Sequence, residues 1–117
     1  MKSGFNIKKY EIYTCNFGNN PGSVQSGVHP VLIIQDDRLN RFSPTTVVAP
    51  ITSVLKKKHL PSHLIIGKKY GLRKPSMVLF EQIRTVNQYE LDKYIGIIND
   101  EKTRKKARNA CMKTIIV

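Results

Sequence analysis

The chain consists mainly of short runs of apolar and β-branched residues separated by turn residues, which is the pattern of a compact β domain. These runs predict strands over residues 11–17, 31–35, 45–52, 63–66 and 77–86, of which the last is the longest. The polar segment 36–44 leaves room for a short helical turn. Residues 1–8 show no such pattern, so we expect a loose N-terminal extension there.

The predicted strands differ in how they should be buried. In the first strand, alternation puts Tyr13, Cys15 and Phe17 on one face, which we expect to point to the core. The run 31–35 is apolar almost throughout, as in a strand that is covered on both faces. In the third strand Pro50 has no N–H for a ladder, which predicts an edge position or a bulge.

The period changes to that of a helix near the end of the chain. Small and apolar residues recur at helical spacing at Thr103, Ala107, Ala110, Cys111 and Thr114. Asn99 or Asp100 is the expected N-cap of this helix. Strands followed by a closing helix predict a mainly β (α+β) fold, namely a small β-barrel with short helices and a C-terminal helix.

Length and composition exclude several protein classes. At 117 residues we expect one domain over 1–117, and a hydrophobic fraction of 40% excludes a disordered chain. No apolar run approaches the roughly 20 residues of a membrane-spanning helix. Because the first residues lack a secretory signal, we expect a cytoplasmic protein in which Cys15 and Cys111 are small buried apolar residues, not a disulfide.

The charge balance points to an anionic partner. Twenty Lys and Arg against eight Asp and Glu give a net charge of +12. Such an excess attracts polyanions at long range and speeds their encounter with the protein. RNA, DNA, an acidic protein and an anionic membrane all remain open on this evidence.

The sequence offers no set of metal ligands. Its histidines are His29, His59 and His63, without a cysteine or carboxylate cluster at ligand spacing. Pro61 excludes a helix that would direct His59 and His63 at one ion, and a pair of loop histidines is usually plain surface. We therefore expect no metal site and no cofactor.

Four blocks of sequence carry a resemblance to a known family. They are PGSVQSGVHPVL at 21–32, NRFSPT at 40–45, VAPITS at 48–53 and EQIRT at 81–85. In this order and at this spacing they resemble the MazF/PemK (Kid, ChpA-like) toxins of type II toxin–antitoxin systems, over residues 10 to 96 or so.

This resemblance implies a fold, an activity and partners. The fold would be an SH3-like antiparallel barrel that forms a symmetric homodimer. The activity would be metal-independent, sequence-specific cleavage of single-stranded RNA, including mRNA, through the neighbouring 2′-OH. It would leave 2′,3′-cyclic phosphate and 5′-OH ends and inhibit translation and growth. The partner would be an acidic MazE-like antitoxin, and no membrane would be involved.

The resemblance also places candidate site residues. The expected catalytic residues are His29 and Thr52, and the expected RNA-binding residues are Ser23, Gln25, Phe42, Gln82 and Arg84. Such cleavage needs a base, an acid and a cationic or donor-rich pocket around the phosphorus. From the residues alone, the loop around Ser23 is an ordinary polar hairpin loop, Thr52 is a surface threonine, and Arg84 either binds phosphate or pairs with Glu81.

Two positions depart from the family pattern. His29 stands where the family usually has Arg, and Val24 stands where it often has an acidic residue. Arg is permanently charged and bidentate, and His is neither. Three explanations remain open: His29 is an acid–base group, another cation such as Arg84 or Arg41 binds the phosphate, or the chain is a catalytically weakened variant.

Two rival functions share the predicted barrel. One is a CcdB-like toxin that binds DNA gyrase without cutting nucleic acid. The other is a catalytically inactive RNA-binding module that remains the partner of an antitoxin. The blocks around Thr52 and Arg84 favour the ribonuclease, whereas His29 and Val24 leave room for the CcdB-like rival.

Overall fold

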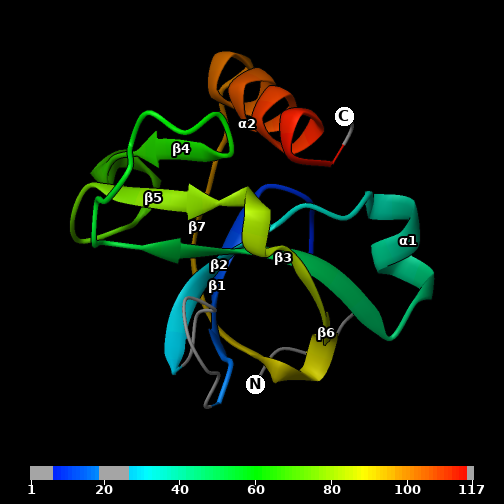
Figure 1. The fold of residues 1–117 in the computed structure, drawn as a ribbon. Helices are drawn as coiled ribbons and strands as arrows, with labels where there is room; N and C mark the ends of the chain where they lie inside the picture. Colours follow the sequence, from blue (N-terminus) through cyan, green and yellow to red (C-terminus); the bar gives the residue numbers. More distant parts are fainter. Residues whose placement is uncertain (1–6, 19–26, 116–117) are drawn as a thin grey trace.

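The computed structural model describes residues 7–18 and 27–115 (Figure 1). Within these ranges the strands are β1 (Glu11–Asn16), β2 (Val28–Ile33), β3 (Thr45–Thr52), β4 (His63–Ile66), β5 (Ser76–Leu79), β6 (Arg84–Asn87) and β7 (Leu91–Ile97). The helices are α1 (Asp37–Phe42) and α2 (Glu101–Ile115), with the 3₁₀ turns η1 (Lys68–Tyr70), η2 (Phe80–Gln82) and η3 (Gln88–Glu90).

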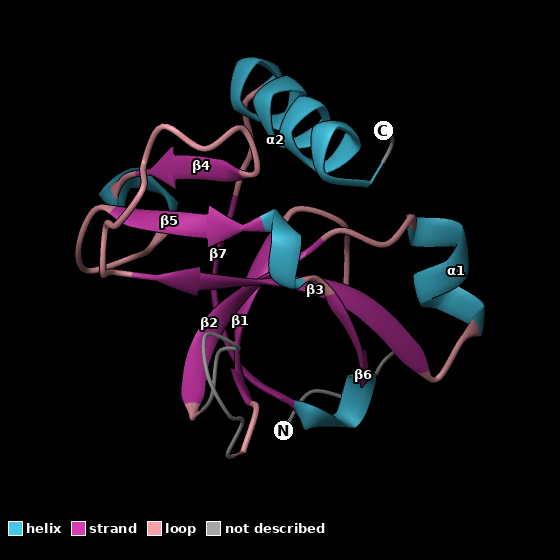
Figure 2. Cartoon of the chain, viewed as in Figure 1, coloured by secondary structure: helices cyan, strands magenta, loops and turns pink. Residues whose placement is uncertain are grey.

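All described strand pairs are antiparallel, and the strands follow the order β4-β5-β3-β2-β1-β7, with β6 paired to β3. Val48 pairs with both Ile33 and Arg84, so β2 and β6 flank β3 on opposite sides. On the same side of β3 as β6, β5 pairs with β3 from Ile51 onward. Figure 2 shows the sheet curling so that β1, β2, β3 and β6 surround an interior, with α2 on the outside near β4.

The two faces of the central strands belong to two cores. Ile12 and Leu32 lie in a first core, together with residues of β4, β5 and α2. Tyr13 and Val31 lie in a second core inside the curled sheet, together with residues of β6 and β7. This arrangement confirms the predicted inward face of β1, and it explains why the second strand is apolar on both sides.

The ends of the curled sheet meet through a turn. No ladder joins β4 to β7 in the described residues, but η1 packs against β7. A Cβ on Gly96 would overlap the backbone carbonyl of Tyr70, and one on Gly71 would overlap that of Ile95. The predicted antiparallel β fold with a C-terminal helix is thus confirmed. Strand pairing does not close the barrel in the described residues, and η1 packs against β7 at the open side.

The predicted single strand over 77–86 is wrong. The structure divides it into β5, η2 and β6. The reason is that Phe80 packs in the first core whereas Val86 packs in the second, so the chain must turn between them. The Phe80 N–H donates to the Ser62 carbonyl at 2.9 Å, outside any strand ladder.

Two other predictions need correction. Pro50 lies in the central strand β3, not at an edge, in the interval between the β6 ladder that ends at Val48 and the β5 ladder that begins at Ile51. Its missing N–H therefore falls where the ladder is already interrupted. The loose start predicted over 1–8 fails at Ile7, which is buried in the second core; residues 1–6 lie outside the described ranges.

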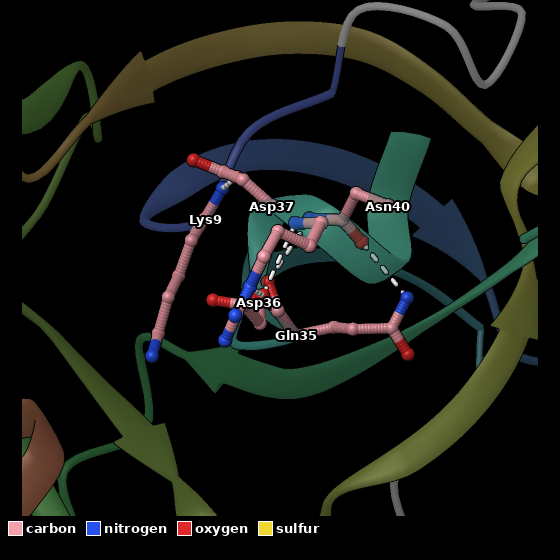
Figure 3. A network of polar contacts seen from close by, with 6 residues as sticks. Lys9, Gln35, Asp36, Asp37 and Asn40 are labelled. Carbon is pink, nitrogen blue, oxygen red and sulfur yellow. Dashed lines mark hydrogen bonds and ion pairs between the residues drawn. The ribbon is translucent and has the colours of Figure 1, made fainter. Parts of the chain in front are cut away.

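The short helix predicted between two strands is α1, and a polar network holds it (Figure 3). Asp36 is its N-cap and accepts from the Arg38 N–H at 3.1 Å. The side chain of the buried Asn40 accepts from the Gln35 amide at 3.0 Å. Because the Lys9 N–H donates to the Asp37 carboxylate at 2.6 Å, the same network ties the turn before β1 to α1.

Asp100, one of the two predicted caps, begins α2. Its carboxylate accepts from the Thr103 N–H at 3.0 Å and from the Tyr70 hydroxyl at 2.5 Å, with Lys69 at 3.9 Å. Ala107 and Ala110 are buried as the helical period predicted. No helix of the described part is long and apolar enough to cross a membrane.

These contacts make stability depend on pH. Hydrogen bonds from Thr103 and Tyr70, helped by the charge of Lys69, hold the pKa of Asp100 well below its usual range. A depressed carboxyl pKa stabilises the fold at neutral pH, and this stabilisation declines progressively as pH falls from the ordinary carboxyl range toward the lower pKa of the folded state. We expect Asp100→Asn to lower the melting temperature by about 3 °C at pH 7 and by a clearly smaller amount near pH ~2.

Thermal unfolding followed by circular dichroism from pH 2 to 8 measures this difference. Asp92→Asn is the matched control, since Asp92 is an exposed aspartate on β7. A deficit of Asp100→Asn that stays constant at all pH values would show that the contacts are neutral hydrogen bonds alone.

Candidate functional site

Strand register brings His29 and Thr52 together. The ladder between β2 and β3 ends with Val31 opposite Pro50. His29 and Thr52 lie beyond the last pair of this ladder, near the start of β2 and at the end of β3. The two residues predicted to be catalytic therefore lie at the adjoining ends of two adjacent antiparallel strands, and both line the cleft described below.

A cation lies close to this pair through an aromatic ring. The His29 ring stacks on Phe17, with centroids 6.4 Å apart and 29° between planes. The Arg84 guanidinium carbon lies 4.7 Å from the centroid of the Phe17 ring. Phe17 is only 8% exposed, as expected for a core residue. We call Arg84, Phe17 and His29 the ring stack. Because Arg84 and His29 both contact the Phe17 ring, a permanent positive charge lies close to His29.

Cys15 pairs with His29 across β1 and β2, but it is not a reactive thiol. Burial, followed by the charge of Glu90, raises the pKa of Cys15 to about 11, although Arg84 opposes the shift. The thiol thus stays protonated and un-nucleophilic near neutral pH. The opposing effect of Arg84 means that its charge lies near Cys15. Both Cys15 and Cys111 are free, in line with the prediction.

Thr52 stands at the last position of β3, where the strand runs into a loop. Its hydroxyl oxygen accepts from the Val54 N–H at 3.1 Å. This bond fixes the oxygen and leaves the hydroxyl proton to be donated elsewhere. A donor at a fixed strand end suits a phosphate oxygen.

A cleft of about 760 Å³ borders these strand ends. Its lining comes from β1, β2, the end of β3, the loop after η1, and β7, and includes both His29 and Thr52. Thr14 and Pro30, which also line the cleft, are opposite each other on the strand face that carries Ile12 and Leu32. His29 belongs both to the ring stack and to the lining of the cleft, so the two meet at these strand ends.

Of the other predicted residues, Gln82 ends η2, two positions before Arg84. Glu81 hydrogen-bonds His63 at 2.7 Å, and the described ion pairs include none between Glu81 and Arg84. The structural salt bridge considered for Arg84 is therefore not formed within the described chain. The contact of Arg84 with Phe17 takes its place.

The predicted phosphate loop is described only at its ends. Ser23 and Gln25 lie outside the described residues, as does Val24. Gly27 has φ of +80° and donates to the Gly18 carbonyl at 2.7 Å, which closes the base of the loop beside the ring stack. A residue with positive φ at this closing turn suits glycine.

Phe42 does not join the other predicted site residues. It ends α1 and is 81% exposed, beside Arg41. It precedes the first residue of β3, whereas Thr52 is the last, so the length of this strand separates them by roughly 20 Å. Stacking of a base on Phe42 would thus occur away from the strand ends, and Arg41 is too far away to act there.

Sequence reasoning missed the wall of the cleft that β7 and the loop after η1 supply. Arg73, Lys74, Lys93 and Tyr94 all line it. The available signal was the run 94–98, which is rich in isoleucine and is interrupted only by Gly96.

Comparisons with known proteins identify the family. Residues 8–111 match the family described as PemK-like, MazF-like toxin of type II toxin–antitoxin system. The chain is 43% identical over 100 residues to a Bacillus subtilis protein named Endoribonuclease EndoA, covering 85% of this chain and 86% of that protein.

Solved structures share the fold. An endoribonuclease in complex with its cognate antitoxin from Mycobacterial species superposes with a TM-score of 0.79 at 22% identity, covering 94% of this chain and 95% of that one. MazF from Deinococcus radiodurans superposes with a TM-score of 0.78 at 16% identity, covering 95% and 97%.

Proposed function

The chain belongs to the PemK-like, MazF-like toxins of type II toxin–antitoxin systems, and we propose that it is their endoribonuclease, cutting single-stranded RNA such as mRNA and so inhibiting translation and growth. The observation that carries the proposal is the convergence of His29, Thr52 and Arg84 at the ends of β2 and β3. A relative named as an endoribonuclease at 43% identity supports it.

The proposed reaction uses the RNA's own 2′-OH. The 2′ oxygen attacks the adjacent phosphorus and loses its proton, the bond to the 5′ oxygen breaks, and that oxygen takes up a proton. The products are a 2′,3′-cyclic phosphate and a 5′-OH, with no redox change. The imidazole of His29 is suited to moving these protons, because a histidine ring carries two nitrogens that can donate or accept a proton. No step in this scheme requires a metal ion.

Arg84 and Thr52 have the complementary task of stabilising charge. The phosphorane gains negative charge in the transition state, so preorganised donors and cations lower the barrier. The Thr52 hydroxyl is oriented by the Val54 N–H to donate, and Arg84 is positioned by the Phe17 ring. Of the two candidate cations, Arg84 fits and Arg41 does not, because Arg41 lies beside Phe42.

The proposed partners follow from charge and from the relatives. A net charge of +12 suits both an RNA strand and an acidic MazE-like antitoxin. Related toxin structures are described as complexes with antitoxin. We propose in addition that the chain acts as a homodimer in the cytoplasm, where mRNA is found.

The test is cleavage of a long single-stranded RNA in the presence of EDTA. We expect discrete fragments whose 5′ ends are hydroxyls, detected as ends that polynucleotide kinase labels without prior phosphatase treatment. Mapping these ends by sequencing should show a short common sequence.

The control for this experiment is Thr52→Val, which keeps the β-branched shape and removes the donor. It should fold normally and cut at least about 10-fold more slowly. Intact RNA with the wild-type chain, together with inhibition of DNA gyrase, would support the CcdB-like alternative. Intact RNA that is nevertheless bound would support an inactive RNA-binding module.

A further inference from the structure

The cleft beside the strand ends has a cationic rim. Arg73 and Lys74 come from the loop after η1, and Lys93 comes from β7. All three are exposed, and none takes part in the ion pairs found in the described chain. No carboxylate is among the described residues that line the cleft. Three positive charges thus converge without neutralisation on a concave surface.

The interior of the same cleft is apolar and aromatic. Val28 and Val54 are 66% and 56% exposed, and Tyr94 is 52% exposed. Tyr94 is held by an edge-on contact with the buried Tyr13, with centroids 5.6 Å apart and 74° between planes. A half-exposed aromatic ring in a cleft that also carries cations is the combination with which proteins bind single-stranded nucleic acid.

We propose that this cleft binds a nucleotide that flanks the scissile phosphate, with its base against Tyr94 and its phosphates on Lys74, Lys93 and Arg73. The proposal rests on the proposed ribonuclease function and adds a specificity-determining subsite to it. Because His29 and Thr52 border the cleft, a strand that crosses their end of the sheet enters it directly. The cleft, at about 760 Å³, is large enough for a nucleotide.

Charge favours RNA over a second copy of the chain as the occupant. Each copy carries a net charge of +12, and the cleft adds local positive charge to that repulsion. An RNA strand neutralises the rim instead, and releases counterions as it does so. The experiments below must therefore distinguish RNA binding at this cleft from binding of a second copy of the chain.

The first measurement is the affinity for a single-stranded oligonucleotide of mixed sequence with 2′-O-methyl groups, which cannot be cleaved through the 2′ oxygen. Fluorescence anisotropy at several salt concentrations gives the salt slope. Lys74→Met and Lys93→Met should each weaken binding several-fold and reduce the slope by about 0.7. The matched control is Lys105→Met, on the exposed side of α2, which should change neither.

The second measurement is the map of cleavage ends. Tyr94→Leu should relax the base preference at one position beside the cut and weaken oligonucleotide binding at least about five-fold, whereas Tyr94→Phe should keep both. Tyr89→Leu, which replaces an equally exposed tyrosine on η3, is the control. The two lysine variants should slow cleavage at all sites alike, because phosphate contacts carry no sequence information.

Several outcomes overturn the subsite. The first is that the wild-type chain does not bind the probe, and the second is that Lys105→Met weakens binding as much as the cleft variants do. The third is an unchanged cleavage map for Tyr94→Leu. The fourth is that the cleft variants lose self-association in sedimentation but still bind RNA, which would mean that a second copy of the chain occupies the cleft. A wild-type chain that binds the probe but cuts no RNA refutes the proposed ribonuclease function instead, so the two failures are distinguishable.

Discussion

Replacing Arg84 with Met should lower the single-turnover rate of RNA cleavage by about 10²–10³-fold. The reason is that the family's usual cation is replaced by His29, and Arg84 brings a permanent charge close to His29 through the Phe17 ring. Met retains an unbranched apolar side chain that can pack on the ring. The melting temperature should therefore fall by no more than about 4 °C, since a cation–π contact contributes about 1 kcal/mol.

A second substitution separates charge from packing. His29→Arg, introduced into the Arg84→Met variant, should recover a large part of the lost rate, because it returns a guanidinium to the other side of Phe17. In the wild-type background the same change should have a much smaller effect. Full activity of Arg84→Met would remove Arg84 from the mechanism and leave the weakened-variant explanation of His29 in place. Rates come from quenched-flow gels, with circular dichroism as the check on folding.

The alternation of side chains along β1 is an example of a feature of the fold that the sequence predicts. Tyr13, Cys15 and Phe17 fall on one face in the sequence and pack in one core in the structure. Asp100 was likewise one of the two N-caps expected for α2 from the sequence, because capping is an interaction between residues close in the chain. Such local patterns are predictable since the groups involved lie within a few residues of one another.

The site depends on contacts that are distant in sequence. Nothing near His29 indicates that Thr52 lies at the adjoining strand end, since this follows from how β2 and β3 pair over their whole length. The position of Arg84 is harder still to predict from sequence, because it depends on the turn that the chain makes between β5 and β6. Resemblance to a family supplied these residues as a set; periodicity alone supplied none of them.

The wall of the cleft was missed for a related reason. Gly96 interrupts the pattern of β7, and glycine usually weakens a strand. Here it is required by the tertiary structure, because the Tyr70 carbonyl occupies the space that a side chain would fill. The same contact that makes the strand hard to recognise joins η1 to β7 at the open side of the barrel.

Gly96→Ala should therefore be strongly destabilising, by roughly 3 kcal/mol, equivalent to a fall of about 10 °C in melting temperature. The added methyl overlaps backbone atoms of Tyr70, which cannot rotate away as a side chain could. Tyr70 in turn is buried and bonded to Asp100, so any shift is transmitted to the start of α2. Gly67→Ala is the matched control, since a Cβ there meets nothing within 4 Å, and it should be neutral or slightly stabilising. Equal melting temperatures for the two alanine variants would mean that η1 and β7 do not hold each other in place.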